Sequence, residues 1–291
     1  MIDLHCHSTA SDGTDTPTEL VANAVAAGLR VMAITDHDTT GGWTEATEAV
    51  HALPTAFTLV PGAEFSCTHT GPDRRPITLH ILGYLFDPDA PGLRAERARL
   101  RRSRLDRAAE IVEALAADGY PISWSQVADL AGDGVVGRPH LGQALQQSGV
   151  VASVDEAFAD LLSDTSRYYR PKADSPAVDL IGLVGQAGGA TVIAHPWARR
   201  RGSVLAEPAL AELVAAGLAG IEVDHVDHTL ADRARLRELV AEWQLLGTGS
   251  SDYHGTHKAV RLGAETTSAD TLDRLLTLTS GVVPVHSPGG Q

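Results

Sequence analysis

Short apolar segments alternate with amphipathic ones along most of this chain. Apolar runs rich in β-branched residues predict buried strands at 31–35, 57–60, 78–86, 190–194, 220–223 and 245–249. Helical periodicity with start and stop signals predicts helices at 17–28, 43–52, 176–188, 207–217, 231–243 and 269–279, with Ser175 as the N-cap of the third. Strand–helix alternation over this length indicates an α/β fold with a largely parallel sheet, open or closed into a barrel.

The alternation stops between about residues 94 and 172. Residues 94–119 have the pattern of one long helix with a shared apolar face, and shorter helical patterns follow at 123–131, 138–147 and 153–162. We therefore expect an α/β body in two parts, 1–93 and 173–286, with a helical insertion at 94–172 and a tail at 287–291.

Seven arginines and only two acidic residues occupy positions 94–107 of the predicted long helix. Such a run is typical of a solvated helix face, and it is also compatible with a surface that faces a phosphate group. The sequence leaves both interpretations open.

Composition narrows the class of protein. The chain has 291 residues, of which 43% are hydrophobic, and a net charge of −14, so its overall field would not attract nucleic acid. No apolar run reaches the ~20 residues of a membrane helix, and the first residues lack the pattern of a signal peptide. Cys6 and Cys67 do not suggest a disulfide framework. We expect a cytoplasmic protein with neither a membrane nor a protein partner.

Histidines and acids follow the predicted strands. The segments that carry them are "DLHCHSTASDG", "TDHD", "PGAEFS", "AHP", "DH" at 224–225 and "SDYH", while His80 lies inside the strand at 78–86. The carboxyl ends of parallel strands meet at one mouth, where so many carboxylates would repel each other without cations. Imidazoles and carboxylates together suit Zn, Mn or Fe(II) better than Ca or Mg, and their number implies two or three ions.

The segments "DLHCHS", "TDHD", "PGAEFS", "HILGY", "AHP" and "SDYH", in this order, resemble the PHP (polymerase and histidinol phosphatase) family. The resemblance covers the whole chain apart from the tail, and it implies a distorted (β/α)7 barrel. The helical insertion and the "GRPH" segment at 137–140 resemble a bacterial subgroup that acts on nucleotides. That subgroup includes nucleoside 3′,5′-bisphosphate phosphatases and a 5′-to-3′ exoribonuclease.

The resemblance implies metal ligands at the positions that match the family motifs. They are His5, His7, Asp12, His37, Glu64, His80, His195, Asp252 and His254. Asp36 is expected to orient His37 or to cap a turn. Asp224 and His225 could contact substrate, transfer a proton or have a structural role. His69, His228 and His257 are expected at the surface.

The implied activity is hydrolysis of a phosphate ester by metal-activated hydroxide, with two or three Mn, Zn or Fe ions. Asp12, His195 or His225 could assist the leaving group, and Arg138, His140 and Lys172 are expected to contact the substrate. The expected substrate is a small nucleotide such as AMP, a nucleoside 3′,5′-bisphosphate such as 3′-phosphoadenosine 5′-phosphate, or short 5′-phosphorylated RNA.

Three alternatives remain at this point. A histidinol-phosphate phosphatase would use the same barrel and much the same ligands. A metal-dependent amidohydrolase also begins with HxH, but its usual bridge is a carboxylated lysine; this chain has no lysine before Lys172, and Glu64 stands where a bridge is needed. A non-catalytic module, stabilised by metal, could bind nucleic acid or a protein partner, but it would not need the complete ligand set.

Overall fold

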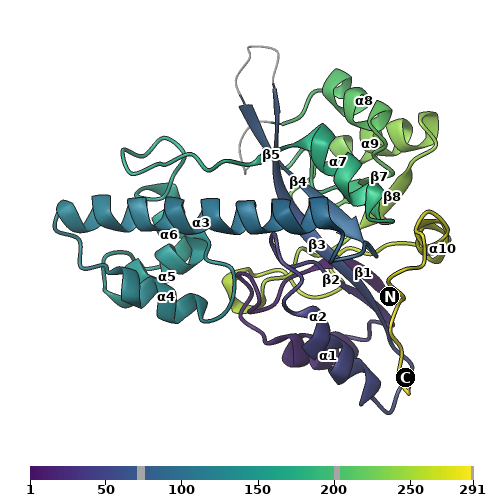
Figure 1. The fold of residues 1–291 in the computed structure, drawn as a ribbon, viewed down its shortest axis with the longest axis horizontal. Coiled ribbons are helices and arrows are strands. Elements are labelled where there is room, and N and C mark those ends of the chain that lie inside the picture. Colours follow the sequence, from purple (N-terminus) through teal and green to yellow (C-terminus); the bar gives the residue numbers. More distant parts are fainter. Residues whose placement is uncertain (71–75, 200–203, 290–291) are drawn as a thin grey trace.

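The computed structural model describes residues 1–70, 76–199 and 204–289, whose strands form one sheet curled into a nearly closed barrel (Figure 1). In spatial order the strands are β1 (Ile2–Cys6), β2 (Val31–Ile34), β3 (Thr58–Thr70), β4 (Pro76–Tyr84), β6 (Ala190–Ile193), β7 (Gly220–Asp224) and β8 (Leu246–Gly249). The short β5 (Ser175–Pro176) pairs with β3 outside this path. The expected barrel is therefore confirmed.

Strand direction brings six carboxyl ends to one mouth of the barrel. The pairs β1–β2, β2–β3, β6–β7 and β7–β8 are parallel, whereas β4 is antiparallel to both β3 and β6. The ends approach each other where Cys6 forms a bridge with Tyr253, and the amide of His7 donates to the carbonyl of Tyr253 at 2.9 Å. The first strand is thus placed beside the last.

Most helices lie close to their predicted positions. Those attached to the barrel are α1 (Pro17–Ala26), α2 (Trp43–His51), α7 (Ala177–Gln186), α8 (Glu207–Ala215), α9 (Leu230–Glu242) and α10 (Ala269–Thr277). The predicted N-cap at Ser175 is wrong, because Ser175 and Pro176 pair with β3 and the helix begins at Ala177. Among the described helices, none is long and apolar enough to cross a membrane.

Four consecutive helices occupy the region where the alternation stops: α3 (Pro91–Ala117), α4 (Trp124–Ala131), α5 (Arg138–Gln147) and α6 (Val154–Ala159). Figure 1 shows α3 as a long rod that passes from these helices to the barrel. Their buried apolar side chains, which include Ile111, Leu115, Leu141 and Leu145, form a cluster separate from the clusters of the barrel. The boundaries at 94 and 172 stay a prediction.

The arginines of α3 attach the helix to its surroundings. Arg97 donates to Thr40 Oγ1 at 2.6 Å, in the loop after β2. Arg99 donates to the carbonyl of Ala173 at 2.7 Å, where the chain returns to the barrel. Arg104 extends to the barrel mouth itself. The arginines at 94–107 therefore do not all lie on a solvated helix face, because three of them bind the barrel or the segment that returns to it.

A backbone contact joins the helical region to the loop after β1. The amide of Val135 donates to the carbonyl of Ala10 at 3.0 Å. Gly134 makes this approach possible, because a Cβ there would lie 2.5 Å from the carbonyl oxygen of Thr9. The helices are thus held against the loop that carries Asp12.

Candidate metal centre

The predicted metal ligands converge at the mouth of the barrel. They come from β1 (His5) and the residues after it (His7, Asp12), from the segment after β2 (His37), from β3 (Glu64), from β4 (His80), from the turn after β6 (His195), and from the segment after β8 (Asp252, His254). Glu64 lies within β3 rather than after it, because the strand continues to Thr70. His80 reaches the same mouth because β4 runs in the opposite direction.

Glu64 is the centre of this cluster and is buried. Its Oε2 lies 3.0 Å from His5 Nε2 and 3.1 Å from His7 Nε2. Its Oε1 lies 2.8 Å from His80 Nδ1 and 3.2 Å from His195 Nε2. One carboxylate therefore faces histidines on both of its oxygens, as a side chain that bridges two cations would.

Asp12 forms a second centre beside the first. Its Oδ1 lies 3.4 Å from His254 Nε2 and 3.8 Å from His7 Nδ1, and its Oδ2 lies 3.7 Å from His37 Nε2. Asp252 Oδ1 lies 3.4 Å from both His7 Nε2 and His254 Nδ1. His7 thus stands between the two centres.

The donors form three groups, and within each group all the ligand atoms lie within 4.8 Å of one another. They are His7, Asp12, His37 and His254; His5, His7, Glu64 and Asp252; and His37, Glu64 and His80. In the described part of the chain, the buried atoms Asp12 Oδ1 and His37 Nδ1 have no hydrogen-bond partner. Buried polar atoms without partners are costly, and nitrogen and carboxylate donors suit divalent transition metals, so the residues present fit such ions.

Burial and the neighbouring charges shift the pKa values of the carboxyl and imidazole groups in the cluster. Burial opposes ionisation of Asp12 and Glu64, but the surrounding histidines hold the pKa of both carboxyls well below the usual range. Burial would lower the pKa of His7, yet hydrogen bonds to Asp252 and Glu64 raise it to about 9. Burial lowers the pKa of His37 to about 3 in spite of the nearby Glu64 and Asp12 carboxylates. The carboxylates are therefore ionised, and they stand among imidazoles of which His7 is held protonated and His37 neutral.

Glu222 is a site residue that the sequence reasoning missed. It is buried in the middle of β7, with Oε1 3.1 Å from His5 Nδ1, and Oε2 accepts from the amide of His195 at 2.8 Å. Burial opposes its ionisation, but His5 lowers the pKa of Glu222 to about 2. A carboxylate behind a ligating histidine fixes the orientation of its ring. The available signal was a lone acid in the apolar strand "GIEV".

Lys258 and His225 flank Asp252 on the side away from Glu64. Lys258 Nζ donates to Asp252 Oδ2 at 2.7 Å, and His225 Nε2 lies 3.5 Å from the same oxygen. His225 Nδ1 accepts from the amide of Asp227 at 3.1 Å. A neutral His225 ring therefore carries its proton on Nε2, which faces the cluster.

Arg104 is the second residue that the sequence reasoning missed. Its Nε donates to Asp38 Oδ2, and its Nη2 donates to Ser66 Oγ at 2.7 Å. Burial disfavours its charge, but Asp38 raises the pKa of Arg104, and Arg104 in turn holds the pKa of the buried Asp38 low. Burial and the charge of Arg104 lower the pKa of Lys172 to about 8. Two cations thus stand together at the edge of the metal cluster.

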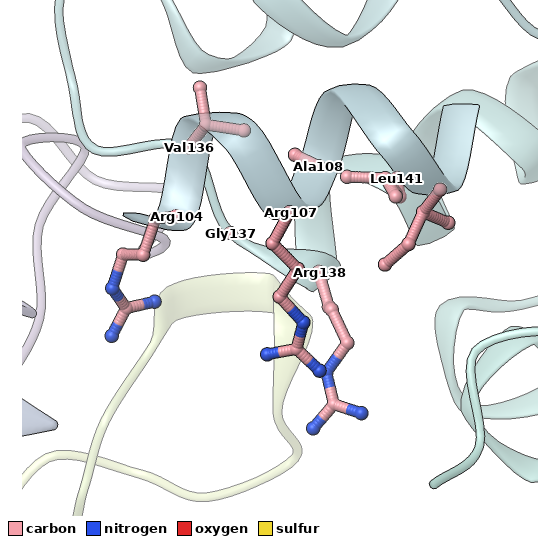
Figure 2. A pocket seen from close by; sticks show the side chains of 8 residues that line it. Arg104, Arg107, Ala108, Val136, Gly137, Arg138 and Leu141 are labelled. Atoms are coloured by element: carbon pink, nitrogen blue, oxygen red, sulfur yellow. The ribbon is translucent and has the colours of Figure 1, made fainter. Parts of the chain in front are cut away.

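The other predicted substrate contacts lie at the start of α5. Arg104, Arg107 and Arg138 line a cavity of only about 10 Å³, and Figure 2 shows their guanidinium groups pointing in the same direction. Arg138 also pairs with Asp164 at 2.6 Å. His140 is buried, and its Nδ1 accepts from the amide of Gly137 at 3.0 Å.

The expectations for Asp36 and Asp224 can be compared with the contacts that these residues make. Asp36 accepts from Ser8 and Ser11, at 2.6–2.8 Å, so it organises the loop after β1. Asp224 pairs with Arg237 and Arg233, which gives it a structural role.

The three histidines expected at the surface differ from one another. The expectation is wrong for His228, which is buried; its Nδ1 lies 2.9 Å from the carbonyl of Val223 and its Nε2 accepts from the amide of Trp197. His257 is half-buried against Asp12, with Nδ1 2.9 Å from its carbonyl oxygen. His69 is half-buried and lies 3.4 Å from Glu212.

Comparison with known proteins gives consistent matches. The model of the PHP domain family matches residues 3–123. A 5′-3′ exoribonuclease of Haemophilus influenzae is 34% identical over 97% of each chain, and a 3′,5′-nucleoside bisphosphate phosphatase of Chromobacterium violaceum is 32% identical over 87% of each. A Bifidobacterium adolescentis crystal structure described as a metal-dependent phosphoesterase superposes with a TM-score of 0.91, at 36% identity over 97% of each chain.

Proposed function

Because the chain belongs to the PHP family and is a metal-dependent phosphoesterase, we propose that it hydrolyses a phosphate monoester of a small nucleotide. One observation carries this proposal: the donor cluster around Glu64 and Asp12 stands next to two fixed cations, Arg104 and Lys172. Similarity to relatives named for nucleotide and RNA substrates supports the substrate class.

We propose that the nine predicted ligands hold two or three Mn, Zn or Fe ions, with Glu64 as the bridge. Bound ions of this kind lower the pKa of water and polarise the phosphoryl group. The protein contributes orientation: Glu222 holds the ring of His5, and Lys258 holds one oxygen of Asp252 so that the other faces the cluster. His195 lies 3.2 Å from the other oxygen of Glu64, Oε1, and its ring is stacked on that of His5.

The substrate phosphate is proposed to bind between the metal cluster and the cations of the helical region. Arg104 uses Nε and Nη2 for Asp38 and Ser66, which leaves Nη1 to donate to a phosphoryl oxygen. Lys172, whose ammonium group pairs with Asp174, lies beside it. Arg138 and His140, at the start of α5, are proposed to bind the remainder of the substrate.

His225 is proposed to assist the leaving oxygen by donating a hydrogen bond to it from Nε2. Its proton lies on Nε2, because Nδ1 accepts from the amide of Asp227. Asp12, another candidate, has a lowered pKa and is therefore ionised, so it can accept a proton but not supply one. His195 is engaged with Glu64. The Nε2 proton, on the side of the ring that faces Asp252, supports His225 as the proposed residue among the three candidates.

A phosphate-release panel tests this function. AMP, 3′-phosphoadenosine 5′-phosphate, histidinol phosphate and a 5′-phosphorylated oligoribonucleotide are compared with Mn, Zn or Fe(II) present. We expect the highest kcat/KM on a nucleotide, and the loss of turnover with a chelator. A strong preference for histidinol phosphate would overturn the proposed substrate class.

Matched variants connect the activity to the cluster. Glu64→Gln should abolish turnover, because a neutral amide cannot replace a bridging carboxylate. His69→Gln, which changes a half-buried histidine outside the cluster, should leave turnover unchanged. Equal activities of the two variants would contradict the assignment of the site.

A further inference from the structure

We propose that a cleft between the barrel and the helical region binds the leaving group of the substrate, and that its acidic lining selects mononucleotides over RNA strands. The inference rests on the proposed nucleotide phosphoesterase function and specifies its substrate. The cleft has a volume of about 600 Å³, within the range of roughly 300–1,000 Å³ that is typical of small-ligand sites. The cavity among the arginines, at about 10 Å³, is far too small for a nucleoside.

The cleft begins beside Asp12. Its walls come from the loops after β1 and β2, the end of α4, and one side of α5, all of which lie below α3 in the view of Figure 1. Gly13 lines it directly, and so does His257, whose Nδ1 lies 2.9 Å from the carbonyl of Asp12. A phosphate held at Asp12 and Arg104 would therefore have its leaving group at the entrance to this space.

The two histidines of the cleft suit a sugar. His140 accepts a hydrogen bond at Nδ1, so its neutral ring is a donor at Nε2. His257 faces a carbonyl oxygen with Nδ1, so that nitrogen carries the proton and Nε2 is an acceptor. One donor and one acceptor can together bind the hydroxyl groups of a ribose.

The charge of the lining opposes a nucleic-acid strand. Glu45, Asp129 and Asp133 line the cleft, against one arginine, Arg101, which donates to the carbonyl of Asp133 at 3.2 Å. Among the described residues that line the cleft, none is Phe, Tyr or Trp. Proteins that bind single strands use a positive groove with aromatic stacking.

These features distinguish two kinds of leaving group. The neutral nucleoside of a mononucleotide would not be repelled by the carboxylates. A strand would bring its next phosphodiester towards Asp129 and Asp133, and a unit charge about 7–10 Å away in water changes a binding constant about two- to threefold. The cleft therefore favours mononucleotides.

The test compares kcat/KM for AMP, whose leaving group is a neutral nucleoside, with kcat/KM for a 5′-phosphorylated pentaribonucleotide, in the Mn-loaded enzyme. The variant Asp129→Asn with Asp133→Asn should raise the ratio of strand to mononucleotide activity about four- to ninefold. The control variant Asp106→Asn with Glu113→Gln removes two exposed charges from α3 outside the cleft and should leave the ratio unchanged.

Salt gives an independent readout. Removal of the 5′-phosphate from the pentaribonucleotide by the wild type should increase as salt screens the carboxylates, whereas proteins that bind strands through cations lose affinity with salt. A wild type that prefers the pentaribonucleotide, or a cleft variant with an unchanged ratio, would overturn the inference while leaving the phosphoesterase function intact. A lack of turnover on every nucleotide and strand would instead refute the proposed function.

Discussion

Replacing Arg104 separates its structural role from its proposed role in substrate binding. In the wild type this buried side chain pairs with Asp38, and its Nη1 is the group assigned to the phosphate. Arg104→Met removes both interactions at once. The double variant Arg104→Met with Asp38→Asn also removes the negative charge of Asp38, which has lost its partner in the single variant. Asparagine suits this position, since residue 38 has a φ of 54°, a region in which asparagine is well tolerated.

The two roles differ in their expected magnitudes. Asp38 is fully buried as a side chain, so loss of its partner should lower the free energy of unfolding by about 3–5 kcal/mol. The double variant should recover most of this loss, because a neutral amide needs no counter-charge. In both variants the loss of a charge-assisted hydrogen bond, worth about 1.5–3 kcal/mol, should lower kcat/KM about 10- to 150-fold.

Urea unfolding, metal content and initial rates on the preferred nucleotide measure these effects separately. Metal content should stay at the wild-type level, since Arg104 belongs to none of the donor groups. A double variant as unstable as Arg104→Met would refute the electrostatic explanation of stability. A double variant with restored kcat/KM would refute the substrate contact.

Three further predictions address other parts of the molecule. Gly134→Ala should lower the free energy of unfolding by about 1–3 kcal/mol, because its Cβ would lie 2.5 Å from a backbone oxygen. Gly185→Ala, on an exposed part of α7 with no atom within 4 Å of the new Cβ, should raise the free energy of unfolding by about 0.5–1 kcal/mol. Urea unfolding compares the two variants. Glu222→Gln should weaken metal binding about 10- to 100-fold, which chelator competition measures, and an unchanged affinity would exclude an orienting role. With a pKa of about 9, His7 is protonated near neutral pH and must lose that proton to bind a cation. Metal affinity should thus rise with pH up to that value, and calorimetry in buffers of different ionisation enthalpy should detect the released protons.

Elements whose structure depends on residues close together in the sequence could be predicted from the sequence. The helix at 138–147 lies at its predicted position, because Gly137 and Pro139 mark its start and its apolar period is regular. The strand ends with their histidines could also be predicted, because a polar side chain after an apolar run is visible in one segment. The length of β3 could not be predicted: the predicted strand ends at residue 60, whereas the observed strand continues to Thr70 because it pairs with the antiparallel β4.

The residues that complete the site required the tertiary structure. Arg104 is one of seven arginines in a single helix, and only its contact with Asp38 distinguishes it from the others. Glu222 lies inside a strand and acts through His5, which is far away in sequence. His228 follows a strand on a segment that folds back over the barrel, so its burial could not be inferred from its neighbours.

The closure of the barrel by its first and last strands affects the order in which the protein can assemble. The amide of Ser251 donates to Asp3 at 3.1 Å across 248 residues, immediately before the ligands Asp252 and His254. Closing so long a loop is entropically costly and comes late in folding, after local helices have formed. During synthesis, His5 and His7 leave the ribosome long before their partners from the segment after β8. A complete cation site therefore exists only on a chain whose barrel has closed, so that hydrolytic competence and completed folding begin together.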